Sequence, residues 1–477
     1  MRHTRIQQAK PERSFAERIV AVIVAIAMLG GMGYATTSAA MADDTEQTTE
    51  QQAGISLGLH DYDRNAINKG HALKFKNAGP DEYNKYVGEG NGAYTGIVNK
   101  TLINGYPAMA ADKGSESLDY LFGGKPDDKA VTSHEPDGGL LALGEEGYYS
   151  FDADSQNATY DTASNKFTLS KRQCTNQSST PCFAPFGDGS EHDKYSFGMN
   201  LDAEFYMPEG GKVNNQAMVF DFTGDDDVWV FIDGVLVLDL GGIHQALDGS
   251  INFATGNIDY HGKQQSHGTP PATSIDQAFK EAGETWDPTA YKTHHLSFFY
   301  LERGDGGSNC KIKFNLPVKP SKAIDIEKET LGTIDASEKF QFQLFVDSSP
   351  TPYQGKYSVY DAYTKRVVES DVSTGDNDVI KLSRGQFARV QSDSFTDATT
   401  YKVRELNSSG YTVSANGSPM TQQDSGNNAY AETDSFTVGK TSHVTIVNSN
   451  VKPSNNKSIV KTDGGDGDQY TLYLTAS

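Results

Sequence analysis

The pattern of apolar and polar residues between Met218 and His244 predicts two strands and a tight turn. Phe220 and Phe222 alternate with polar residues, which is typical of a strand with one buried face. The run Val228–Ile232 is apolar throughout and predicts a fully buried strand. Asp233-Gly234 follows this run, and because both residues tolerate positive φ, the dipeptide predicts a hairpin turn.

The rest of the chain shows mainly the periodicity of strands. Short alternating runs with glycine-rich turns continue to Leu316, and the segment His294–Leu316 predicts two strands joined by a glycine-rich loop. Two short helical patterns predict helices that begin at Ser115 and Ser274, each with the serine as its cap. These patterns predict a mainly β fold with a few small helices.

Prolines and shifts in composition divide the chain into five segments. Two prolines within Pro317–Pro320 interrupt strand pairing, and Pro453 marks a second boundary. Beyond it Tyr470–Leu474 alternates as a strand, and because a lone hairpin is unstable we expect a truncated third β-unit. The expected segments are a signal peptide (1–42), a disordered linker (43–54), a first β-unit (55–317), a second β-unit (318–451) and the truncated unit (452–477).

The N-terminus has the pattern of an export signal. Basic residues from Arg2 to Arg18 precede the apolar stretch Ile19–Leu29, which is too short to span a bilayer comfortably. Ala40-Met41-Ala42 then supplies a small-x-small cleavage site, so we expect a mature chain that starts at Asp43. This predicts a secreted or cell-surface protein with no membrane insertion after cleavage. The alternative is an uncleaved membrane anchor.

Charge and cysteine usage narrow the class of partner and the compartment. The formal net charge is −22, which argues against nucleic acid or anionic membranes as partners, because both require basic surface. Cys174 and Cys182 bracket a short polar loop, and in an exported protein this spacing predicts a disulfide bond. The remaining cysteine, Cys310, is expected to be a small buried hydrophobic residue.

Three consecutive aspartates, Asp225, Asp226 and Asp227, follow the first predicted strand. Their carboxylates repel one another unless something positive lies among them. A hard cation with oxygen ligands would serve, and Ca²⁺ is the usual choice outside cells. The alternative is a solvated acidic loop.

Three strands of the second β-unit each direct one polar side chain towards the core. In each strand two alternating apolar residues set the inward face, and the next inward position is Lys328, Glu405 or Asn448. Separate burial of these groups would cost several kcal/mol each, so we expect them to interact. Burial lowers the lysine pKa and frees its amine as a nucleophile, while it keeps the glutamate protonated.

Attack by this amine on the asparagine would release ammonia and leave a Lys–Asn isopeptide bond. The order and spacing of the three residues resemble the Cna-B and related pilin domains of Gram-positive surface proteins, including the Tyr-x-Val-x-Glu segment at Tyr401–Glu405. The resemblance implies an immunoglobulin-like sandwich in which Lys328 is the nucleophile, Asn448 the acceptor and Glu405 the catalyst. The alternative is that Lys328 reaches solvent and no bond forms.

The aspartate segment resembles a second family. The segments 222–244 and 298–314 resemble the fibro-slime signature and the lectin-like β-sandwich of anthrax protective antigen and yeast adhesins. In sugar-binding members, two aspartates joined by a cis peptide chelate one Ca²⁺ that binds sugar hydroxyls. This implies Asp225 and Asp226 as calcium and carbohydrate ligands and Asp227 as their neighbour. The segment Asp248–Asp259 is a candidate source of further calcium ligands. His244 is expected to have a structural role and not to bind the ion.

Together the resemblances imply a secreted or surface adhesin or fimbrial subunit of a Gram-positive bacterium. Its ligands would be host or bacterial glycans or glycoproteins, and other pilin subunits would be partners. One alternative is a purely structural pilus or surface spacer. A second alternative is an accessory module of a glycoside hydrolase. Since the sequence lacks Gly-x-Ser-x-Gly, His-Glu-x-x-His and P-loop motifs, we expect no enzyme activity beyond autocatalytic isopeptide formation. It also lacks a Leu-Pro-x-Thr-Gly wall anchor.

Overall fold

A computed structural model describes most of the chain between residues 54 and 451. The described residues are 54–76, 84–88, 92–125, 129–144, 146–174, 181–187, 194–261, 267–304, 306–320, 322–365, 367–375, 377–423 and 429–451. The expected signal peptide, nearly all of the linker and the expected third unit lie outside them. Within these ranges no helix is long and apolar enough to cross a membrane.

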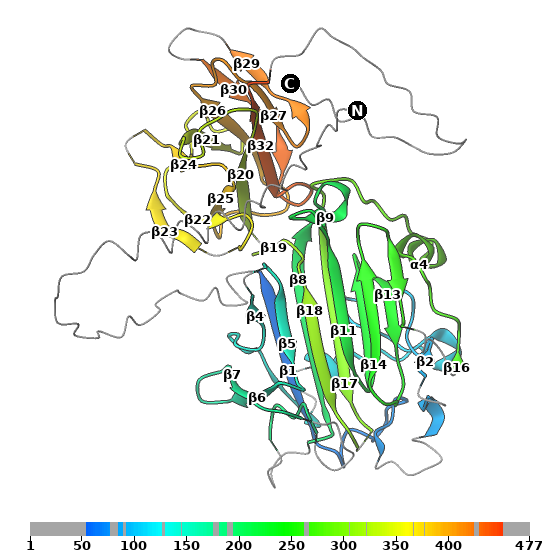
Figure 1. Cartoon of the computed structure of the whole chain (residues 1–477). Coiled ribbons are helices and arrows are strands. Elements are labelled where there is room, and N and C mark those ends of the chain that lie inside the picture. The colour runs from blue at the N-terminus through cyan, green and yellow to red at the C-terminus, as the bar shows by residue number, and fades with distance from the viewer. Residues whose placement is uncertain are drawn as a thin grey trace, which may run out of the picture. The chain divides into compact units, whose positions relative to one another are not determined.

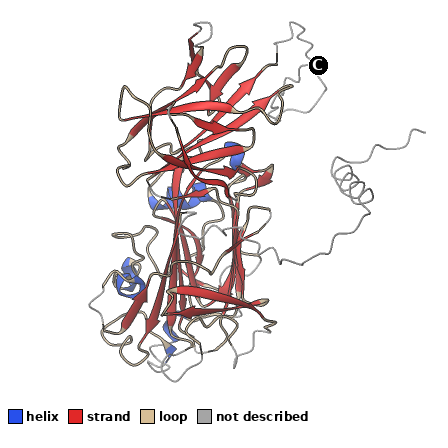
Figure 2. Cartoon of the chain, turned by 90° about the vertical axis from the view of Figure 1, so that its left-hand side faces the viewer, coloured by secondary structure: helices blue, strands red, loops and turns tan. Residues whose placement is uncertain are grey.

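The described part is built from β-sheets with a few short helices, which confirms the mainly β fold (Figures 1 and 2). In the first β-unit, one sheet runs in the order β13-β12-β17-β8-β1-β3, with β19 also paired to β8. Its strands are β1 (Ile55–Tyr62), β3 (Val131–His134), β8 (Phe197–Tyr206), β12 (Asp227–Ile232), β13 (Val235–Leu240), β17 (Thr293–Glu302) and β19 (Val318–Lys319).

The second sheet of this unit runs in the order β15-β14-β11-β18-β5-β4. Its strands are β4 (Ala142–Leu143), β5 (Tyr149–Asp152), β11 (Val219–Asp225), β14 (Leu247–Asn252), β15 (Asn257–Asp259) and β18 (Asn309–Phe314). Three two-stranded sheets accompany them, formed by β2 (Tyr94–Thr95) with β16 (His267–Gly268), β6 (Gln156–Asp161) with β7 (Lys166–Lys171), and β9 (Lys212–Val213) with β10 (Gln216–Ala217).

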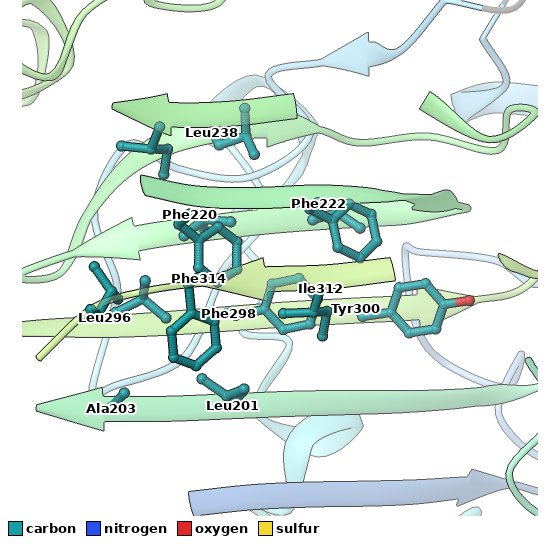
Figure 3. Close-up of a cluster of buried hydrophobic side chains, with 14 of the residues drawn as sticks. Leu201, Ala203, Phe220, Phe222, Leu238, Leu296, Phe298, Tyr300, Ile312 and Phe314 are labelled. Atoms are coloured by element: carbon teal, nitrogen blue, oxygen red, sulfur yellow. The ribbon is translucent and has the colours of Figure 1, made fainter. Parts of the chain in front are cut away.

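The two large sheets of the first unit enclose one apolar core. Phe220 and Phe222 of β11 point into it together with Phe298 of β17 (Figure 3). Each fully buried phenylalanine contributes about 1.5 to 3 kcal/mol of hydrophobic free energy. The core also contains side chains from every other long strand of the two sheets, among them Leu201, Leu238, Ile312 and Phe314.

Strand alternation places a second, smaller cluster on the outer face of the β13-to-β3 sheet. Trp229 and Phe231 of β12 alternate with core residues and pack there with Phe299 and Leu301 of β17. Residues of the loops between β1 and β3 cover them. Val228–Ile232 is therefore buried on both faces, as the apolar run predicts.

The chain changes sheets at the aspartates. β11 belongs to one sheet and β12 to the facing one, so Asp225 and Asp226 lie where the chain crosses between them. Asp233 and Gly234 both have positive φ, 49° and 79°, and join β12 to β13, which confirms the predicted hairpin. The strands predicted within His294–Leu316 are also present, as β17 and β18, although they belong to opposite sheets.

The second β-unit is also a sandwich. One sheet runs in the order β23-β22-β25-β20-β32-β27-β28 and the other β24-β21-β26-β30-β29, with β31 also paired to β26. The strands are β20 (Ala323–Leu331), β21 (Phe340–Val346), β22 (Lys356–Asp361), β23 (Val367–Ser373), β24 (Ile380–Leu382), β25 (Gln386–Gln391), β26 (Thr400–Leu406), β27 (Thr412–Ala415), β28 (Ser418–Pro419), β29 (Thr421–Gln423), β30 (Tyr430–Glu432), β31 (Phe436–Thr437) and β32 (His443–Ser449).

The two sandwiches have separate apolar cores. The core of the first ends along the sequence at Val318, and the core of the second begins at Ile324. Val318–Lys319 pairs with β8, so the first sandwich includes two residues beyond the Pro317 boundary inferred from sequence.

One of the two predicted helices is present. The helix α4 (Ile275–Ala282) has Ser274 as its N-cap, whose Oγ accepts the Gln277 N–H at 3.2 Å. The prediction at Ser115 is wrong, because Ser115 adopts a φ of 56° and only the 3₁₀ turn η4 (Asp119–Phe122) follows. The other 3₁₀ turns in the described ranges are η2 (Asn84–Tyr86), η3 (Ala111–Lys113) and η5 (Glu209–Gly211).

Candidate functional site

The three polar residues that alternation directs to the second core meet inside it. Lys328 lies on β20 and Asn448 on β32, which are parallel neighbours in one sheet. Glu405 lies on β26 of the facing sheet. All three are buried, with relative exposures of 0%, 0% and 1% respectively. The sandwich therefore brings groups from two sheets to one point.

Their contacts form a connected chain. Lys328 Nζ lies 2.8 Å from Asn448 Oδ1 and also donates to the Ile446 carbonyl at 3.1 Å. Asn448 Nδ2 donates to Glu405 Oε1 at 2.5 Å, and Lys328 Nζ lies 3.9 Å from Glu405 Oε2. The lysine amine also lies 4.4 Å from the centre of the Phe340 ring. Apolar side chains therefore surround a site with little access for water.

Burial shifts both titratable groups towards their neutral forms. It lowers the pKa of Lys328, with the Glu405 carboxylate opposing the shift. It also raises the pKa of Glu405, with Lys328 and the hydrogen bond from Asn448 opposing. A neutral amine is the form that can act as a nucleophile, and a protonated carboxyl is the form that can donate a proton.

The aspartate cluster of the first sandwich is buried and contains its own counter-ion. Asp227 forms a bidentate pair with Arg303, at 2.5 Å to Nε and 3.1 Å to Nη2, and neither side chain is exposed. The solvated acidic loop considered from sequence is therefore wrong. Arg303 belongs to the segment 298–314 that carries the family resemblance, and its role depends on Asp227, which lies 76 positions away.

Asp225 and Asp226 are linked by a cis peptide bond, the linkage that the family resemblance implies. Asp225 Oδ1 accepts the Asn309 N–H, and Asp226 Oδ2 accepts the Arg303 N–H at 3.0 Å. Burial raises the pKa of Asp226, with Arg303 opposing and the two neighbouring aspartates adding to the shift. The site therefore holds Asp226 where its ionised form is disfavoured.

Two further polar side chains beside the aspartates each have one oxygen without a hydrogen-bond partner. Glu302 is 1% exposed, and its Oε2 has no partner. Asn309 Oδ1 is likewise buried and unpartnered. Burial and the carboxylates of Asp226 and Asp225 raise the pKa of Glu302. In the sequence Glu302 is notable only for its place in the segment 298–314 that carries the family resemblance, and no role was predicted for Glu302 or Asn309. They approach the aspartates through the end of β17 and the start of β18.

The described residues contain no group of three or more His, Cys, Asp or Glu side chains arranged to hold a metal ion. The segment Asp248–Asp259 forms most of the β14–β15 hairpin, which runs along β11 away from Asp225. Both ring nitrogens of His244 lie 2.9 Å from backbone carbonyl oxygens, of Leu240 and Gln245, which is a structural arrangement.

The cysteines adopt the states expected from sequence. Cys174 and Cys182 are joined by a disulfide bond. Cys310 is a buried free thiol on β18. Its side chain belongs to the core of the first sandwich.

Comparisons with known proteins give only partial matches, and no protein-family model matches the chain. The Dictyostelium discoideum proteins psiF and psiO are each 33% identical to it, over 134 and 137 residues. Each match covers 28% of this chain, which spans only 16% of psiF and 14% of psiO.

Two solved structures show a weak likeness. The pilus-presented adhesin Spy0125 (Cpa) is 15% identical with a TM-score of 0.19, over 43% of this chain and 36% of that one. The major pilin from Streptococcus pyogenes is 13% identical with a TM-score of 0.20, over 84% and 93%. At these values the likeness carries no assignment of function.

Proposed function

We propose that this chain is an exported surface protein with a covalently cross-linked stalk module and a ligand-binding module. The observation that carries the proposal is the buried contact between Lys328, Asn448 and Glu405. Burial of a lysine side chain costs free energy unless its amine has a specific partner. Lys328 is fully buried, and its amine contacts the Asn448 amide. A covalent bond between β20 and β32 suits a protein that bears tension outside the cell.

The cross-link would form in one balanced step. Lys328 Nζ attacks Asn448 Cγ, a new C–N amide bond forms, and the bond from Cγ to Nδ2 breaks with release of ammonia. Glu405 contacts Nδ2, so it would carry the proton lost by the amine to the departing nitrogen and return to its starting state. In this orientation of the amide, Glu405 assists the leaving group rather than polarising the carbonyl. No other reaction is proposed for the chain.

Intact mass spectrometry of the exported chain, after reduction of the Cys174–Cys182 disulfide, tests this directly. The native protein is expected to be lighter by one ammonia than its sequence. The variants Lys328→Arg and Glu405→Gln are expected to have their full sequence mass. Lys381→Arg, at an exposed position on β24, is the matched control and should still lose ammonia. A native protein of full sequence mass would make the proposal wrong.

For the binding module we propose a calcium-dependent glycan site at Asp225 and Asp226. The unpartnered oxygens of Glu302 and Asn309 beside them support it, because Ca²⁺ takes carboxylate and amide oxygens together. These side chains would turn towards the ion on binding, and its positive charge would add to that of Arg303, which already opposes the carboxylate repulsion. The proposed ligands are host or bacterial glycans, and the proposed partners include other pilin-type subunits.

Calcium titration calorimetry and a glycan array with and without chelator test this site. We expect Asp226→Ala to abolish calcium binding and chelator-sensitive glycan binding. Asp276→Ala, at an exposed position on α4, is the control and should leave both unchanged. Absence of calcium binding, with a normal cross-link, would instead favour a structural spacer.

A further inference from the structure

The outer face of the sheet in the first sandwich carries a large groove away from the aspartate cluster. The groove has a volume of about 990 Å³, at the upper end of the range for small-molecule sites. Its floor is formed by β1 and β8, which are hydrogen-bonded neighbours (Figure 1). Its lining also includes the turn Asn104–Tyr106 and the segment His134–Asp137, which begins at the last residue of β3.

A directed network of hydrogen bonds fixes the floor. The Asp202 carboxylate can only accept, so Asn200 presents its Nδ2 to Asp202, at 3.1 Å, and its Oδ1 to His60. His60 Nε2 must then carry the hydrogen that it donates to Asn200 Oδ1, at 2.8 Å. His60 Nδ1 is left to accept the Ser133 hydroxyl, at 2.9 Å. Burial lowers the pKa of His60 to about 4, so the ring is neutral at physiological pH.

The absence of a side chain at Gly58 keeps this floor open. Gly58 of β1 pairs with Asn200 of β8, and a Cβ at that position would overlap Asn200 Oδ1. Any other residue would therefore displace the Asn200 amide and disrupt the hydrogen-bonded floor. Ser56, two residues earlier on the same face, is exposed and lies opposite Asp202.

The charges of the lining determine which ligands fit. Glu135, Asp137 and Asp202 line the groove, and no lysine or arginine occurs among its described lining residues. An anionic ligand such as a sulfated or phosphorylated glycan would meet only like charge. The neutral groups of the lining include hydroxyls and amides, which can both donate and accept hydrogen bonds, as sugar hydroxyls do. Tyr106 adds a half-buried aromatic ring to one wall.

We infer that this groove binds a neutral oligosaccharide directly, without calcium, as a second carbohydrate site. It shares no lining residue with the aspartate cluster, so it stands independently of the proposed calcium site. The hydrogen-bonded polar floor would orient sugar hydroxyls, and the volume of the groove would accommodate more than one sugar ring.

The test is an array of neutral oligosaccharides probed with the full exported chain in chelator, followed by calorimetry with the best-bound sugar. Ser56→Trp places an indole over the floor and is expected to weaken binding at least about tenfold. Ser170→Trp, an equally exposed strand position on β7, is the matched control and should bind as the native chain does. Circular dichroism and melting temperature establish that both variants fold.

The outcomes separate this site from the calcium site. Binding that persists in chelator and in Asp226→Ala, but is lost in Ser56→Trp, supports the groove. Glycan binding lost in chelator and unchanged in Ser56→Trp overturns the groove and leaves the calcium site standing. Absence of any glycan binding in chelator overturns it as well.

A basic peptide is the remaining occupant that the carboxylates would accept. An oligolysine probe that binds, is blocked by Ser56→Trp and is released as salt rises from about 0.05 to 0.5 M would identify a cation site and overturn the proposal. Binding of a neutral sugar should be insensitive to this change in salt.

Discussion

At the scale of single residues, we expect Glu405 to decide whether the proposed covalent bond closes the second sandwich. The proposed bond joins residues 120 positions apart, and a cross-link over a loop of this length removes about 5 kcal/mol of chain entropy from the unfolded state. Glu405→Gln keeps the size of the side chain but cannot shuttle a proton. We expect this variant to lack the bond and to lose about that much stability in urea unfolding.

The mass of each sample is the control for this comparison, because only uncross-linked protein should show the loss. A Glu405→Gln variant that is still lighter by one ammonia than its own sequence would remove Glu405 from the reaction. An uncross-linked variant with native stability would show that the bond adds no free energy to the fold.

A second residue, His60, should make stability depend on pH. Its unfolded pKa of 6.5 falls to about 4 in the folded protein because burial disfavours the charged ring. Between these values the unfolded state takes up a proton that the folded state does not, so stability falls as pH falls. One pKa unit corresponds to about 1.4 kcal/mol, so we expect a loss of about 3 kcal/mol between pH 6.5 and 4 from this group.

Urea unfolding at a series of pH values measures this slope. His60→Gln should flatten it, whatever its effect on stability at neutral pH. Thr168→Gln, at an exposed position on β7, is the control and should retain the native slope. A His60→Gln slope equal to the native one would mean that other groups cause the acid sensitivity.

At the scale of elements, the pair between Asp227 and Arg303 ties the start of β12 to the end of β17. Both side chains are fully buried, so removing one partner leaves an uncompensated charge, which costs about 3 to 5 kcal/mol. We expect Arg303→Met to destabilise the first sandwich by about that amount. The double variant Asp227→Asn with Arg303→Met should recover part of the loss, and a double-mutant cycle in urea measures the difference. Purely additive losses would contradict the pairing.

The sequence predicts an element well where its conformation depends on residues that are close together in the chain. Alternation placed Lys328, Glu405 and Asn448 on inward faces, and the structure buries all three. The Asp233-Gly234 turn was also predicted, because its conformation depends on the two residues themselves. The predicted helix at Ser115 is absent. This serine has a φ of 56°, whereas a residue that caps a helix N-terminus normally has an extended backbone.

Features that depend on pairing between distant segments were not predicted. The partner of Asp227 is 76 residues away, and the floor of the groove joins His60 to Asn200 across 140 residues. No periodicity in one segment carries that information. The same limit explains why β11 and β12, adjacent in sequence, could not be assigned to opposite sheets.

At the scale of the whole molecule, the separate cores predict two unfolding transitions. The apolar clusters of the two sandwiches share no residue, and the sandwiches are joined by polar contacts such as the hydrogen bond from Lys365 Nζ to the Gly147 carbonyl, so we expect each core to melt in a transition of its own. The cross-link lies within the second core, and the proposed calcium site lies in the first sandwich. We therefore expect Glu405→Gln to lower one transition only. Calcium at about 100 times its dissociation constant should stabilise the other by about 2.7 kcal/mol.

Differential scanning calorimetry of the native chain and the two variants Glu405→Gln and Asp226→Ala measures both transitions. Calcium should raise the melting temperature of the first sandwich in the native chain and in Glu405→Gln. It should have no effect in Asp226→Ala. A single transition that moves as a whole in every variant would show that the sandwiches unfold together. Two transitions that both respond to calcium would instead place the ion, or a coupling to it, in both sandwiches.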